Sequence, residues 1–178
     1  EAKAFSVSFW MYFRDGGDYA NSHNGRIITW NQPGHTTSFR RIIMSVGASS
    51  ITVGMQVDSA KGANYDGHRF TTNGTLTRDT WHHVVITFSG GNGDGTQSTT
   101  ATMMHNYVDG VEDTRLPTKG SQTHYLEDPS PVLNGNVTVG NRNNGTRPFN
   151  GYLDEMQVWN KALSQAEVTD LYARRGFN

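Results

Sequence analysis

The sequence predicts an all-β domain, an antiparallel β-sandwich with one short helix near its C-terminus. Residues 5–13 alternate strictly between Phe5, Val7, Phe9, Met11 and Phe13 on one face and smaller or amphipathic residues on the other. Six Asn-Gly pairs interrupt the chain, and both residues tolerate the positive φ of tight hairpin turns. Thr (20), Asn (15) and Gly (20) make up 55 of the 178 residues, which favours strands and turns over helices.

Weaker alternation predicts further strands, and strands separated by turn signals favour antiparallel sheets over βαβ units. These strands are expected at residues 26–30, 39–46, 51–58, 81–88, 102–109, 137–140 and 152–159. Only the last part of the chain has a helical pattern. Ser164 and Glu167 form a capping box, so we expect the Ser164 hydroxyl to accept from the Glu167 N–H.

Composition limits the classes of function. A net charge of −1 and a pI near 6.7 give no basic face for nucleic acid. The longest aliphatic run, 84–86, is far shorter than the ~20 residues of a membrane span, so no membrane insertion is expected. The absence of Cys excludes disulfides and thiolate catalysis. We expect one domain, residues 1–178, and interpret the start at Glu1, without an initiator Met, as that of a processed product or of a piece of a longer polypeptide.

Several blocks, in order, resemble a laminin-G-like domain of the concanavalin A-like lectin/glucanase superfamily, in its pentraxin-related branch. The blocks are residues 5–13, 81–88, 107–110, 137–140 and 151–164. The resemblance implies a jelly-roll sandwich of two curved antiparallel sheets, often with a structural calcium ion. Members of this family usually have a further strand ahead of the first block, whereas only four residues precede it here. Either that strand has been cut away, or a neighbouring subunit covers the exposed N-terminal edge. Residues 141–144 read Asn-Arg-Asn-Asn where pentraxins have an acidic calcium cluster, which argues against pentraxin-type calcium-dependent binding.

Asp154 is the candidate metal ligand. Period two places it on the same inward face as Met156 and Val158, and a carboxylate in a core must be paired, hydrogen-bonded or bound to a metal. The resemblance implies structural Ca²⁺, and the alternative is a network of protein groups alone. Both stay open.

Catalysis is not expected. The Glu-x-Asp-x-x-Glu strand of the superfamily's glucanases has no counterpart, and Asp154 and Glu155 are neighbours on opposite faces of a strand. His82 and His83 also point to opposite faces, so they do not chelate one ion together.

Exposed aromatic rings and planar donors are what a sugar ligand needs. Trp10 and Tyr12, on the outer face of the first strand, are expected either to line a concave sheet or, with Trp30, to pack beneath loops. The candidate ligand-binding residues are Trp10, Tyr12, Tyr19, Trp30, Arg40, His68, Arg69, Arg142 and Arg147. The predicted function is a non-catalytic recognition or adhesion module for glycans or proteins, in an exported or surface-displayed protein. The alternative is a structural decoration or fibre module of a virion or large assembly, and a polysaccharide-cleaving enzyme is disfavoured.

Overall fold

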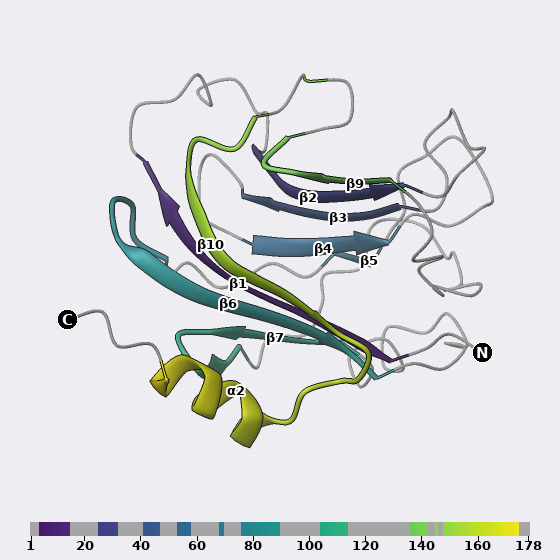
Figure 1. Cartoon of the computed structure of the whole chain (residues 1–178), viewed down its shortest axis with the longest axis vertical. Coiled ribbons are helices and arrows are strands. Elements are labelled where there is room, and N and C mark those ends of the chain that lie inside the picture. Colours follow the sequence, from purple (N-terminus) through teal and green to yellow (C-terminus); the bar gives the residue numbers. More distant parts are fainter. Residues whose placement is uncertain are drawn as a thin grey trace.

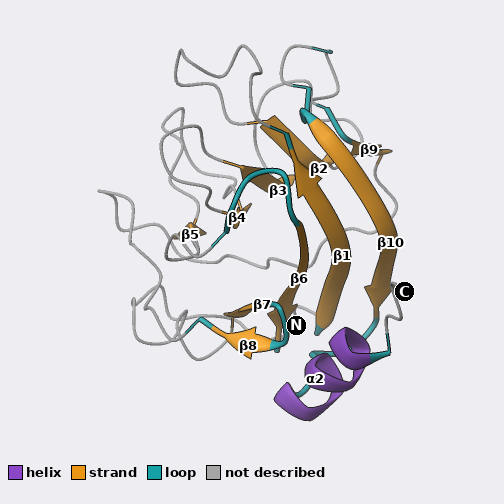
Figure 2. Ribbon diagram, turned by 90° about the vertical axis from the view of Figure 1, so that its left-hand side faces the viewer, coloured by secondary structure: helices purple, strands orange, loops and turns teal. Residues whose placement is uncertain are grey.

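The computed structural model describes residues 4–14, 25–31, 41–46, 53–57, 68–69, 76–89, 104–113, 136–141, 145 and 148–174. Within them, two five-stranded antiparallel sheets face each other, and helix α2 (Gln165–Ala173) lies on the side of the first sheet that faces away from the second (Figures 1 and 2). The predicted jelly-roll sandwich with one C-terminal helix is confirmed.

The first sheet, called sheet A, has the order β10-β1-β6-β7-β8, and the second, sheet B, has the order β5-β4-β3-β2-β9. Sheet A consists of β10 (Gly151–Trp159), β1 (Phe5–Phe13), β6 (Trp81–Phe88), β7 (Met104–Val108) and β8 (Val111–Glu112). Sheet B consists of β5 (His68–Arg69), β4 (Val53–Val57), β3 (Arg41–Val46), β2 (Gly25–Asn31) and β9 (Asn136–Val139). All eight predicted strands agree with these bounds to within two residues at either end, whereas the two-residue strands β5 and β8 were not predicted.

The inward faces of β1 and β6 form the core. Phe9 and Phe13 are buried with Phe88 and Ile86, and Ile27 of sheet B closes the other side. The inward set expected from alternation in residues 5–13 is therefore confirmed. Burial of these large side chains supplies the main driving force for joining the two sheets.

A second, smaller cluster lies between sheet A and α2. Val85 and Tyr107 on the outer face of the sheet pack against Leu163 and Val168, with Trp159 and Leu171 at the border. Because β1 and β6 are covered on both faces, nearly all of their residues are buried. No helix in the described part of the chain is long and apolar enough to cross a bilayer.

The capping box of α2 forms as predicted. The Ser164 hydroxyl accepts from the Glu167 N–H at 3.4 Å, and the Glu167 carboxylate accepts from the Ser164 N–H at 2.9 Å. The helix also holds the β7–β8 turn, because the Gln165 side-chain amide donates to the Gly110 carbonyl at 2.7 Å.

The alternation of β10 is broken by a β-bulge at its centre. Ser8 of β1 pairs with Gln157 and Trp10 pairs with Asp154, so β10 has one residue more than β1 in this interval. Glu155 takes the positive φ of +47° that accommodates the extra residue. Leu153 and Met156, three residues apart, consequently both pack against the core.

The prediction that Asp154 is buried is therefore wrong. The bulge rotates Asp154 to the outer face of sheet A, where its side chain is exposed. Val158, its expected inward companion, is also exposed, whereas Met156 does pack against the core as predicted.

Candidate functional site

Three aromatic side chains gather on the outer face of sheet A. Tyr12 of β1 is the register partner of both Trp81 on β6 and Tyr152 on β10. Ring centroids lie 5.6 Å apart for Tyr12 and Trp81, 5.7 Å for Tyr12 and Tyr152, and 6.5 Å for Trp81 and Tyr152. These spacings are those of favourable aromatic pairs. We call Tyr12, Trp81 and Tyr152 the outer aromatic patch.

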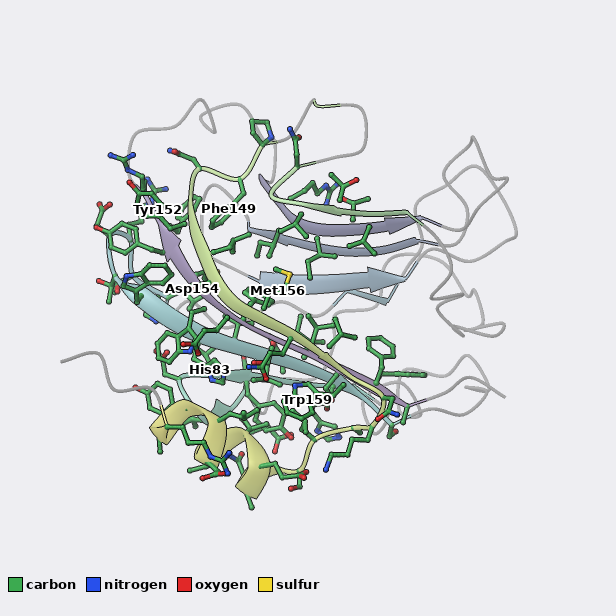
Figure 3. The ribbon with its side chains drawn as sticks, viewed as in Figure 1. His83, Phe149, Tyr152, Asp154, Met156 and Trp159 are labelled. Atoms are coloured by element: carbon green, nitrogen blue, oxygen red, sulfur yellow. The ribbon has the colours of Figure 1, made fainter. Side chains whose placement is uncertain are left out.

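The patch is open to solvent and has a charged group on two sides. Tyr152 is 53% exposed, and Tyr12 and Trp81 are partly buried. The Arg14 guanidinium lies 5.6 Å from the centre of the Tyr152 ring, within the range of a cation–π contact. Asp154 follows Tyr152 by two residues on the same strand and also lies on the outer face (Figure 3). Its register partner on β1 is Trp10.

Trp10 belongs to a different, closed cluster next to the patch. Its ring is 5.7 Å from Tyr172 of α2 and 5.1 Å from His83, and it is only 7% exposed. Of the two expectations for Trp10, packing is the one observed, with a helix rather than a loop as its cover. Trp10 and Tyr12 lie on the outer face of sheet A, which is convex because the strands curve around sheet B (Figure 1). They therefore do not line a concave sheet, which was the other expectation.

The structure does not describe the side chains of seven other predicted ligand-binding residues. Tyr19, Arg40, Arg142 and Arg147 lie outside the described residues. For Trp30 in β2 and for His68 and Arg69 in β5, the structure describes the backbone alone. Trp81, Tyr152 and Arg14 were not among the residues predicted from the sequence. Their signal was present in the outward parity of Trp81 beside Tyr12, but the strand order was needed to use it.

Asp154 forms a local contact within the bulge, since its Oδ1 accepts from the Glu155 N–H at 2.8 Å. Among the residues that the structure describes, no group of three or more histidine and acidic side chains is arranged to hold a metal ion. Calcium at Asp154 stays a prediction, now without the inward-facing carboxylate that motivated it.

His82 and Asp109 form a close pair at the edge of the core. His82 Nδ1 lies 2.8 Å from Asp109 Oδ2, and the Thr77 N–H donates to His82 Nε2 at 3.0 Å. Because Nε2 accepts a hydrogen bond from the Thr77 N–H, Nδ1 carries the imidazole hydrogen and donates a hydrogen bond to Asp109. The other Asp109 oxygen accepts from the His83 N–H at 2.9 Å. The pair therefore fastens the β7–β8 turn to β6.

A second histidine–carboxylate pair joins β7 to β8, with His105 Nδ1 2.6 Å from Glu112 Oε1. Nearby, burial raises the pKa of the Tyr107 hydroxyl, and the negative charge of Glu112 adds to this effect. Tyr107 therefore keeps its proton and serves as a packing residue under α2.

The laminin-G family model described as the concanavalin A-like lectin/glucanases superfamily matches residues 1–169. This chain belongs to that superfamily. A search of curated proteins finds no match.

Solved structures with the same fold come from several organisms. A SAP-like pentraxin from Limulus polyphemus superposes with a TM-score of 0.59 at 17% identity, over 99% of this chain and 72% of that one. The CBM40 domain of a Ruminococcus gnavus sialidase, bound to α2,3-sialyllactose, gives 0.64 at 11% identity over 96% and 83%. A putative carbohydrate-binding protein from Bacteroides ovatus gives 0.53 at 17% identity over 94% and 40%. At these identities the similarity shows the fold.

Proposed function

We propose that this chain is a non-catalytic recognition module that binds glycans, and that it belongs to an exported or surface-displayed protein. Membership of a lectin and glucanase superfamily supports the first part. Two structural neighbours support it further, since one is a carbohydrate-binding domain holding a sialyllactose and another is described as a carbohydrate-binding protein. Fold similarity alone does not fix a function. Two features of this chain's own side chains also favour binding.

The histidine of the His82–Asp109 pair is fully hydrogen-bonded within the protein, whereas the Tyr152 ring of the outer aromatic patch is open to solvent. His82 uses both ring nitrogens, one to donate to Asp109 and one to accept from Thr77, so neither is directed at a substrate. Tyr152, in contrast, presents half of its surface to solvent from β10, the edge strand of sheet A. Chemistry of this kind favours binding over proton transfer.

A glycan array probed with the purified chain tests the proposal. Saturable binding to a set of glycans, without release of new reducing ends, is the expected result. Release of reducing ends would instead indicate a polysaccharide-cleaving enzyme. A stable oligomer that binds no glycan on the array would favour the structural assembly module predicted as the alternative.

A further inference from the structure

The outer aromatic patch exists because of the bulge in β10. A strand that kept its alternation would direct Tyr152 to the same side as Met156, which packs against the core. The extra residue at Glu155 reverses the parity, so that Tyr152 and Asp154 face outward instead. Bulges often re-aim side chains in this way next to functional sites.

The bulge is held in a conformation that non-glycine residues rarely adopt. Glu155 has a φ of +47°, which is costly for a residue with a Cβ, and the Asp154 carboxylate accepts the Glu155 N–H within the bulge. The nine-residue strand β10 thus has a left-handed residue at its centre, whereas a regular strand would avoid the conformational strain of that residue.

The chemistry of the patch fits a sugar ring. A pyranose has a face of C–H groups, which packs on an aromatic ring, and a rim of hydroxyl groups, which need donors and acceptors. Tyr152 offers the exposed ring, Arg14 offers forked N–H donors, and Asp154 offers carboxylate oxygens. Tyr152 and Asp154 project from the same strand face about 7 Å apart, so one ligand can reach both.

The size of the patch argues against a protein partner. Even three fully exposed aromatic side chains, at about 150–250 Å² each, fall short of the roughly 800 Å² that each partner contributes to a stable protein interface. Tyr12 and Trp81 are partly buried, so the real area is smaller still.

We propose that the outer aromatic patch is a glycan-binding site for a pyranose with an unhindered C–H face. The sugar stacks on Tyr152, and Asp154 and Arg14 hydrogen-bond its hydroxyls. This inference rests on the proposed function and assigns that function to one surface.

Isothermal titration with lactose, cellotriose and 3′-sialyllactose tests it, using Tyr152→Ala and a matched control. Val158 lies on the same strand as Tyr152 and has the same exposed fraction of 53%, so Val158→Ala removes a comparable exposed side chain away from the patch. Tyr152→Ala should weaken binding about tenfold or more, as truncation of an aromatic anchor does, and Val158→Ala should stay within about twofold of the wild type. Tyr152→Phe should retain binding, and its retention shows that loss in the alanine variant comes from the missing ring.

Trp81 provides a local readout in the same titration. Its indole lies 6.5 Å from Tyr152, so a bound sugar should change the tryptophan emission of the wild type, and this change should disappear in Trp81→Phe. Asp154→Asn and Arg14→Gln should each weaken binding about threefold or more, as loss of a charged hydrogen bond does.

The inference and the proposed function fail separately. Probe binding that is unchanged in Tyr152→Ala and Asp154→Asn would overturn the inference and leave the glycan-binding module intact. Failure of the wild type to bind any of the three probes would also overturn it, whatever the glycan array shows. Loss of binding in Val158→Ala as large as in Tyr152→Ala would overturn the assignment to this surface.

Discussion

Replacing Phe9 by alanine tests the central packing of the sandwich. Phe9 is fully buried in the middle of β1, and its register partner on β6 is Val84, which is also fully buried. Truncation removes roughly 100–150 Å² of buried apolar surface, which at about 25 cal/mol per Å² corresponds to about 2.5–4 kcal/mol. The cavity left between the two sheets adds to this, so the expected loss of unfolding free energy is about 3–5 kcal/mol.

Chemical denaturation followed by far-UV circular dichroism measures this loss. Phe9→Leu is the matched control, because it keeps most of the apolar volume and should cost less than half as much as Phe9→Ala. A loss below about 1 kcal/mol in Phe9→Ala would refute the assignment of Phe9 to the space between the sheets.

Four further predictions concern the helix cap, its glutamate, a glycine and the bulge. Ser164→Ala should lower the unfolding free energy by about 1 kcal/mol in the same denaturation assay, and an unchanged value would argue against the cap. Hydrogen bonds from Lys161 and the Ser164 backbone lower the pKa of Glu167 from 4.5 to about 2, so its contribution is present above pH 4.5 and is lost as the pH falls toward 2. Glu167→Gln should therefore flatten the stability profile in that window, and an identical profile would contradict the shift. Gly151→Ala should cost several kcal/mol or prevent folding, because the added Cβ would lie 1.9 Å from a backbone carbonyl oxygen of β1; a melting midpoint close to that of the wild type would contradict the close approach of the two strands. Asp154→Asn should change the melting midpoint little, because the side chain is exposed, and a large fall reproduced by chelator and reversed by calcium would instead restore the metal prediction.

Side-chain periodicity predicted those parts of the fold that depend on local pattern. The inward set of residues 5–13, the bounds of the strand at 81–88 and the Ser164–Glu167 box all follow from spacing along the chain. The bulge at Glu155 could not be predicted from periodicity, because a single extra residue leaves the alternation in each half of the strand regular. One sign of the bulge was present in the sequence: the apolar residues Leu153 and Met156 are three positions apart, so they cannot both face the core in a regular strand.

The candidate site depended on information that no local pattern contains. Tyr12 was recognised as an outward aromatic, but its neighbours Trp81 and Tyr152 come from strands about 70 and 140 residues away along the chain. The cover over Trp10 depended likewise on where α2 docks. Periodicity assigns a face to each residue, whereas pairing of distant strands decides which residues meet there.

The position of β1 within sheet A has a consequence for how the chain folds. The first described strand pairs on one side with β6 and on the other with β10, near the far end of the sequence. During synthesis, the edge of β1 that β10 will cover stays unpaired until residues 151–159 have left the ribosome. Pairing between strands so far apart in the sequence raises the contact order, which favours slow folding. An apolar strand with an unpaired edge can also pair with a strand of another chain. We therefore expect truncations that remove β10 to aggregate rather than to fold into a smaller sandwich.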